Sequence, residues 1–147
     1  MVEIDDLSGE VVDCAVRIHR DLGPGLLESV YEMVLAGSLA SKGLRIDRQR
    51  PIDIMFDGVH NDAAFRVDLV VEDALLIEVK SVERLAPVHG KQLLTYLRLT
   101  KQPVGLLLNF SGATMKEGIR RVVNDYRQPQ QSSASPRLRV NQSIGDM

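Results

Sequence analysis

The chain has 147 residues, of which 44% are hydrophobic and 26% are charged, and its formal net charge is −2. These values are typical of one soluble globular domain and argue against a protein that coats nucleic acid through bulk positive charge. The single cysteine, Cys14, excludes an internal disulfide and a cysteine-rich zinc site, which fits a reducing cytoplasm. No apolar run approaches the length of a membrane span, so we expect a cytoplasmic protein without a membrane partner.

Two helices are predicted in the first third of the chain. Apolar residues recur at helical spacing over residues 4–21, and Gly23-Pro24-Gly25 then ends the helix. A second helix is expected over residues 26–42, with Glu28 at the start of its apolar stripe. The helix dipole favours an acid there, which explains Glu28 without any function. A carboxylate that projects from a buried stripe toward a metal explains it equally well.

Residues 66–80 predict a β-hairpin, because two apolar runs flank Glu72-Asp73-Ala74. A three-residue loop pairs Val71 with Leu75 and places six aliphatic side chains on one face. A two-residue loop would instead put the two acids on opposite faces. We therefore prefer the three-residue loop, which sets Asp68 opposite Glu78.

Two carboxylates in directly opposed positions repel each other, so the pattern is costly in a purely structural hairpin. A divalent cation such as Mg²⁺ between Asp68 and Glu78 turns the repulsion into attraction, because hard cations prefer carboxylate oxygens. Lys80 points to the same side and is able to orient or deprotonate a water beside the metal. Metal-dependent phosphodiesterases of the PD-(D/E)XK type use this arrangement. An exposed polar face with an accidental pattern is the alternative explanation.

The strands and the helix around this hairpin are predicted less sharply. Residues 44–57 suggest a strand, in which Pro51 indicates an edge or a bulge. A helix is expected from Pro87 to about Leu99, and Gln92 and Tyr96 share one of its faces.

Residues 104–110 form a continuous apolar run, typical of a strand buried on both faces. Strand, helix and buried strand together imply a right-handed parallel crossover. Residues 113–126 fit either a short helix or a final strand. From residue 128 the composition changes to Gln, Ser, Pro and Arg, so we expect one domain over residues 1–127 and a flexible tail over residues 128–147.

Five segments, in this order, resemble the GxxExxY protein family, which is placed in the PD-(D/E)XK nuclease-like superfamily. The resemblance spans about residues 10–124. Its segments are Gly25-Leu-Leu-Glu28-Ser-Val-Tyr31, Arg66-Val-Asp68-Leu-Val-Val, Ile77-Glu78-Val-Lys80, His89-Gly-Lys-Gln92-Leu-Leu-Thr-Tyr96-Leu and Gly105-Leu-Leu-Leu-Asn109-Phe110.

The resemblance implies an α/β protein with a restriction-endonuclease-like α-β-β-β-α-β core, a mixed sheet flanked by helices and an extra N-terminal helix. It also implies that Asp68 and Glu78 bind Mg²⁺ or Mn²⁺. The Val79 carbonyl would be a further ligand, and Glu28 would supplement the metal site from the first core helix.

The same resemblance assigns Lys80 to position the attacking water or to stabilise the charge that develops on the phosphorus centre. Gln92 and Tyr96 resemble the Gln-x-x-x-Tyr motif of RecB-type nucleases, where the helix helps to hold the substrate backbone. Val67 stands where the superfamily's nominal Pro would precede Asp68, but that Pro carries no chemistry.

The expected function is a metal-dependent nuclease that hydrolyses phosphodiester bonds of nucleic acid, with DNA as the expected polymer. The alternative is a non-cleaving module that binds nucleic acid or a protein on a nuclease-like scaffold. Lys80 beside two paired acids favours the enzyme, whereas the small size and modest charge favour an accessory role. A protein partner and a homodimer both stay open.

Overall fold

The computed structural model describes residues 3–125 of the chain. The predicted tail, residues 128–147, therefore lies outside the described residues, and the domain boundary stays a prediction. The elements are α1 (Ile4–Leu22), α2 (Glu28–Ala40), β1 (Ile46–Phe56), β2 (Val59–Val71), β3 (Leu75–Lys80), α3 (Pro87–Thr100), β4 (Val104–Asn109), the 3₁₀ turn η1 (Lys116–Gly118) and β5 (Ile119–Val123). None of the helices described is both long and apolar enough to cross a membrane.

The strands form one mixed five-stranded sheet in the order β1-β2-β3-β4-β5. β3 and β4 are parallel and the other neighbours are antiparallel, which confirms the predicted crossover through α3. From α2 to β4 the elements follow the expected α-β-β-β-α-β order, and α1 is the extra N-terminal helix. The ambiguous segment after β4 contains both predicted alternatives, first η1 and then β5.

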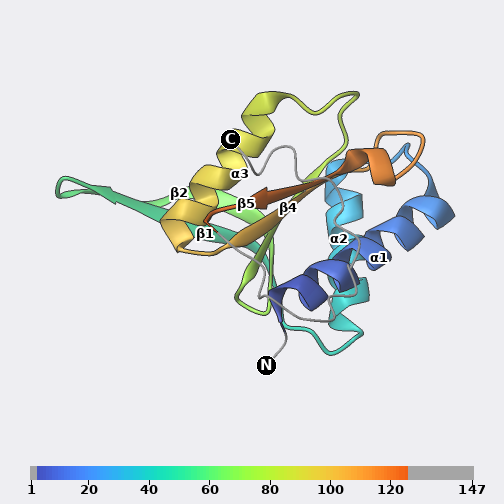
Figure 1. The fold of residues 1–147 in the computed structure, drawn as a ribbon, viewed down its shortest axis with the longest axis horizontal. Coiled ribbons are helices and arrows are strands. Elements are labelled where there is room, and N and C mark those ends of the chain that lie inside the picture. The colour runs from blue at the N-terminus through green and yellow to red at the C-terminus, as the bar shows by residue number, and fades with distance from the viewer. Residues whose placement is uncertain (1–2, 126–147) are drawn as a thin grey trace, which may run out of the picture.

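The two faces of the sheet are covered by different helices (Figure 1). α1 and α2 pack on one face, against a cluster that includes Leu69, Ile77 and Leu106. α3 packs on the other face, against a cluster that includes Val70, Leu76 and Leu107. This alternation follows from the pleat, in which successive side chains point to opposite faces. The sheet is therefore buried on both sides, as the apolar run of β4 predicts.

The hairpin has the predicted three-residue loop, with Val71 paired to Leu75 and Leu69 paired to Ile77. The ladder between β2 and β3 ends at that second pair, and β2 continues with β1 as a two-stranded arm that extends beyond the body (Figure 1). The expectation of six aliphatic side chains on one face is wrong for Val67, which is buried in the cluster beside α3. Val67 and Val70 share this cluster although they are three residues apart, so the alternation of faces along β2 is interrupted between Val67 and Leu69.

Candidate active site

Asp68 and Glu78 lie where β2 and β3 part. The last backbone pair of the hairpin is Leu69 with Ile77, so the two acids occupy the next positions along each strand. Asp68 turns its side chain toward β3, and its Oδ2 accepts a hydrogen bond from the Val79 N–H at 2.8 Å. The Asp68 carboxylate thus accepts the hydrogen bond of a β3 backbone N–H at the point where the backbone pairing of β2 and β3 stops.

Glu78 is a buried acid with an unsatisfied oxygen. Its side chain lies in β3 with a residue exposure of 6%, and its Oε1 has no hydrogen-bond partner among the described residues. Burial, and after it the negative charge of Asp68, raise the pKa of Glu78 to about 9, although the positive charge of Lys80 acts in the opposite direction. Without a cation the pair therefore holds a proton at neutral pH. A cation bound between the two acids would give the free oxygen a partner and would offset the repulsion between the carboxylates.

Lys80 ends β3, and a buried asparagine fixes the chain that follows it. Lys80 pairs with Asn109 of β4, and its carbonyl accepts a hydrogen bond from the Phe110 N–H at 2.9 Å. The Asn109 side chain accepts from the Val82 N–H at 3.0 Å and donates to the Val82 carbonyl at 2.9 Å. The backbone on both sides of Lys80 is therefore held in place, which fixes the point from which the Lys80 side chain extends.

Glu28 lies next to this end of β3. It is the first residue of α2, and its Oε2 accepts the Ser81 N–H at 3.0 Å. The Tyr31 hydroxyl accepts from the Leu26 N–H at 3.1 Å and donates to the Gly23 carbonyl. Hydrogen bonds of the Tyr31 hydroxyl thus close the loop before α2, within the segment that carries the GxxExxY resemblance. Glu28 joins the same segment to Ser81, the residue after Lys80. This contact explains Glu28 structurally, and its role at a metal stays a prediction.

A second acid of α2 reaches the site and was not predicted to do so. Glu32 is 6% exposed, and its Oε2 accepts from the Arg48 Nε at 3.1 Å. The Gln49 Nε2 donates to the Glu32 Oε1 at 2.7 Å and to the Asp68 Oδ1 at 3.2 Å. The position of Glu32 on the buried stripe of α2 is a signal that would have pointed to a partner for this acid, whereas no pattern in the sequence identifies Gln49.

Tyr96 brings α3 toward the two acids. It is 5% exposed, and its ring centroid lies 5.4 Å from that of Phe65. Burial raises the pKa of the Tyr96 hydroxyl, and the charges of Glu78 and Asp68 raise it further. Gln92, one turn earlier on the helix, is exposed. The predicted substrate contacts of Gln92 and Tyr96 stay predictions, although Tyr96 does lie in the field of the acids.

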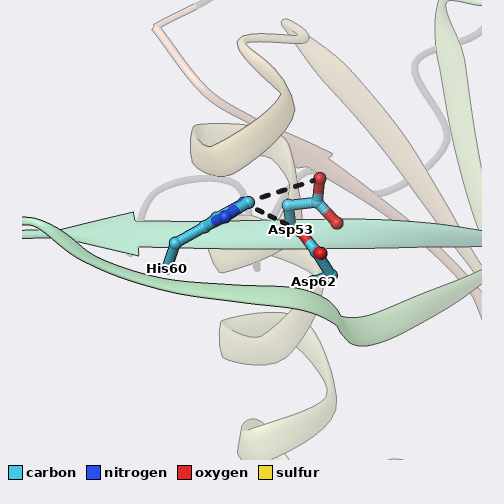
Figure 2. A group of neighbouring side chains, drawn as sticks. All are labelled: Asp53, His60 and Asp62. Atoms are coloured by element: carbon cyan, nitrogen blue, oxygen red, sulfur yellow. Dashed lines mark ion pairs between the residues drawn. The ribbon is translucent and has the colours of Figure 1, made fainter.

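Another group of potential metal ligands lies on the arm. Asp53 of β1 and His60 and Asp62 of β2 form the arm cluster, whose ligand atoms all lie within 4.8 Å of one another (Figure 2). The His60 Nε2 lies 2.9 Å from the Asp62 Oδ1 and 3.9 Å from the Asp53 Oδ2. The side chains are 45–78% exposed, so these pairings are weak. Among the described residues, Glu28, Asp68 and Glu78 do not form so compact a group.

A family model described as the PD-(D/E)XK nuclease superfamily matches residues 5–122. The match runs from α1 to β5 and includes both Asp68 and Glu78. No curated protein and no solved structure matches the chain.

Proposed function

Because this chain belongs to the PD-(D/E)XK nuclease superfamily, we propose that it is a metal-dependent nuclease whose centre lies at Asp68 and Glu78. The observation that carries this location is the Glu78 Oε1, which is buried without a hydrogen-bond partner beside a second carboxylate. Buried polar atoms are nearly always satisfied, so such an atom needs a reason. A bound divalent cation supplies one.

The donor set fits Mg²⁺ or Mn²⁺, since both cations prefer carboxylate and carbonyl oxygens. Asp68 and Glu78 would hold the ion, with the Val79 carbonyl as a further ligand and Glu28 as a supplementary acid. When bound, the ion would polarise the phosphate and lower the pKa of a coordinated water. The raised pKa of Glu78 supports this assignment, because the ion would take the place of the proton that Glu78 otherwise keeps.

The other side chains bind and orient the reactants. The Lys80 ammonium donates hydrogen bonds to the attacking water or to the phosphoryl oxygens as negative charge develops on them. Tyr96 lies in the field of Glu78 and Asp68, and with Gln92 it would hold the substrate backbone. Fixed positions for these donors matter because a small displacement from the reacting atoms lowers the rate strongly.

Within the superfamily, we propose that the chain belongs to the GxxExxY family. We also propose that its substrate is nucleic acid, with DNA as the preferred polymer. The closed segment around Tyr31 and the attachment of Glu28 to Ser81 support the family assignment. We propose a cytoplasmic location, which is supported by the single cysteine, Cys14, because it is buried and forms no disulfide. A homodimer or a protein partner is also part of the proposal, because a formal net charge of −2 gives the chain little bulk attraction to nucleic acid.

The test is cleavage of labelled single-stranded DNA, duplex DNA and RNA in Mg²⁺ or Mn²⁺, compared with Asp68→Asn and Lys80→Ala. Both variants should lose about 100-fold or more in rate, because each removes a group that acts on the transition state. Asp62→Asn is the matched control, because it removes a potential metal ligand from the arm cluster and leaves Asp68 intact.

Loss of cutting in Asp62→Asn alone would move the metal centre to the arm. If the wild-type protein cuts none of the polymers, the nuclease proposal fails. The non-cleaving module that binds nucleic acid or a protein would then be the better account.

A further inference from the structure

Gln49 has an unusual backbone at the position opposite Asp68. Its neighbours pair in one unbroken register, Arg48 with Leu69 and Arg50 with Val67, whereas Gln49 itself is unpaired. Its φ is 53°, in the left-handed region that residues other than glycine rarely adopt. The register is unchanged on both sides of Gln49, so this conformation makes neither a turn nor a bulge. Strained residues of this kind tend to cluster at functional sites.

The Gln49 side chain lies between two carboxylates. Its Nε2 is 2.7 Å from the Glu32 Oε1 and 3.2 Å from the Asp68 Oδ1. Ionised carboxylates only accept hydrogen bonds, so the amide must present its NH₂ group, which has two hydrogens to donate. One amide group therefore satisfies both acids. Asparagine or glycine would adopt this backbone more easily. The backbone does not explain a glutamine here, but the bridge does.

Glu32 anchors the amide from the helix side. It is 6% exposed, and the Arg48 guanidinium holds its second oxygen at 3.1 Å. A buried carboxylate whose two oxygens are both engaged is fixed in orientation. Gln49 is therefore held by a rigid group of α2 and transmits that position to Asp68.

We propose that Gln49 is a positioning residue, which sets the Asp68 carboxylate for metal binding, and that Glu32 holds Gln49 in place. This inference rests on the proposed function, because it assumes that Asp68 is a ligand. Asp68 is fixed from two sides, by the Val79 N–H at Oδ2 and by Gln49 at Oδ1. Residues that orient metal ligands typically change metal affinity or activity by about 10–100-fold when mutated.

The test compares Gln49→Gly with Gln49→Asn and with Ala63→Gly. Gln49→Gly removes the amide but suits the left-handed backbone, so the protein should still fold. Gln49→Asn keeps an amide on a shorter side chain. Ala63 also has a left-handed φ, of 54°, but lies on the arm, so Ala63→Gly controls for the backbone effect alone.

Three quantities are measured. Calorimetric titration gives the affinity for Mn²⁺, steady-state cleavage gives kcat and KM, and NMR of the metal-free protein gives the shift and exchange rate of the Val79 amide proton. In Gln49→Gly we expect Mn²⁺ affinity and kcat to fall about 10–100-fold with little change in KM. The Val79 amide should exchange faster, because its acceptor is no longer held. Gln49→Asn should lie between Gln49→Gly and the wild type, and Ala63→Gly should match the wild type.

Wild-type Mn²⁺ affinity, kcat and Val79 exchange in Gln49→Gly would overturn the inference. An equal loss in Ala63→Gly would also overturn it, because backbone flexibility would then be the cause. If the wild-type protein neither binds Mn²⁺ nor cuts, the proposed function fails on its own. The Val79 amide then still decides whether Gln49 positions Asp68.

Discussion

At the scale of single residues, the main feature is a glutamate that keeps its proton at neutral pH. Burial and the neighbouring Asp68 charge raise the pKa of Glu78 from 4.5 to about 9. One unit of pKa corresponds to about 1.4 kcal/mol, so ionising Glu78 in the folded protein costs a free energy that is large compared with the stability of a domain. At neutral pH the metal-free fold therefore keeps Glu78 protonated, although the same carboxyl group would be ionised in water.

This shift predicts how the stability of the metal-free protein depends on pH. Between pH 4.5 and about 9 the native Glu78 holds a proton that the unfolded chain has released. The contribution of Glu78 is therefore fully present below pH 4.5 and is lost as the pH rises toward 9. The slope approaches about −1.4 kcal/mol per pH unit. Urea unfolding of the wild type and of Glu78→Gln, in EDTA from pH 5 to 9, measures this slope as the difference between the two proteins.

Glu78→Gln should be the more stable protein at pH 8, because its side chain cannot ionise. A stability difference that stays constant from pH 5 to 9 would contradict the raised pKa. Asp53→Asn on the exposed arm is the control, since it removes a carboxylate without touching Asp68 or Glu78.

At the scale of elements, the start of α2 depends on one hydroxyl group. Tyr31 joins the Gly23 carbonyl to the Leu26 N–H, and its ring stacks on Phe110 with the centroids 4.4 Å apart. The Ser81 Oγ also donates to the Leu26 carbonyl at 3.2 Å, so the same loop contacts the end of β3. Tyr31 thus links the entry of α2 to the strand that carries Lys80.

Tyr31→Phe should destabilise the protein by about 1–3 kcal/mol, because two hydrogen bonds are lost while the stack on Phe110 remains. Urea unfolding at constant pH measures this change. Tyr96→Phe is the matched control, since the Tyr96 hydroxyl makes no hydrogen bond within residues 3–125. Equal stability of Tyr31→Phe and the wild type would show that the loop does not need the hydroxyl.

The sequence predicts those elements whose pattern is local. The hairpin register follows from which side chains must share a buried face, and the crossover follows from the apolar run after α3. Gln49 could not be found in this way, because its left-handed backbone has no glycine or asparagine to indicate it. Asn109 was part of a recognised segment, but its contacts with Val82 depend on a parallel strand pairing distant in the chain.

At the scale of the whole molecule, the sheet order brings segments that are distant in sequence to one place. Because β3 lies at the centre of the sheet, α2 approaches Asp68 from one face and α3 brings Tyr96 from the other. The sequence predicted the order of the elements and a strand over residues 44–57, which β1 confirms, but it did not predict that β1 and β2 extend beyond the body as an arm. The tip of the arm exposes Met55, Phe56 and Val59 by 68–72%, so this part of the chain adds little to either core.

The early end of the ladder between β2 and β3 has a mechanical consequence. Only three residue pairs join these strands, and the next position on each strand carries an acid. An ion shared by Asp68 and Glu78 would cross-link the strands there and would replace the missing backbone pair. Saturating Mg²⁺ should therefore slow hydrogen exchange of the Val79 amide by at least about tenfold, while amides of the arm tip exchange as before. Unchanged exchange at Val79 would mean that the ion does not join the strands. Slower exchange at Val79 would mean that the catalytic ion also holds β2 and β3 together. Removal of the ion would in that case loosen the hairpin as well as abolish activity.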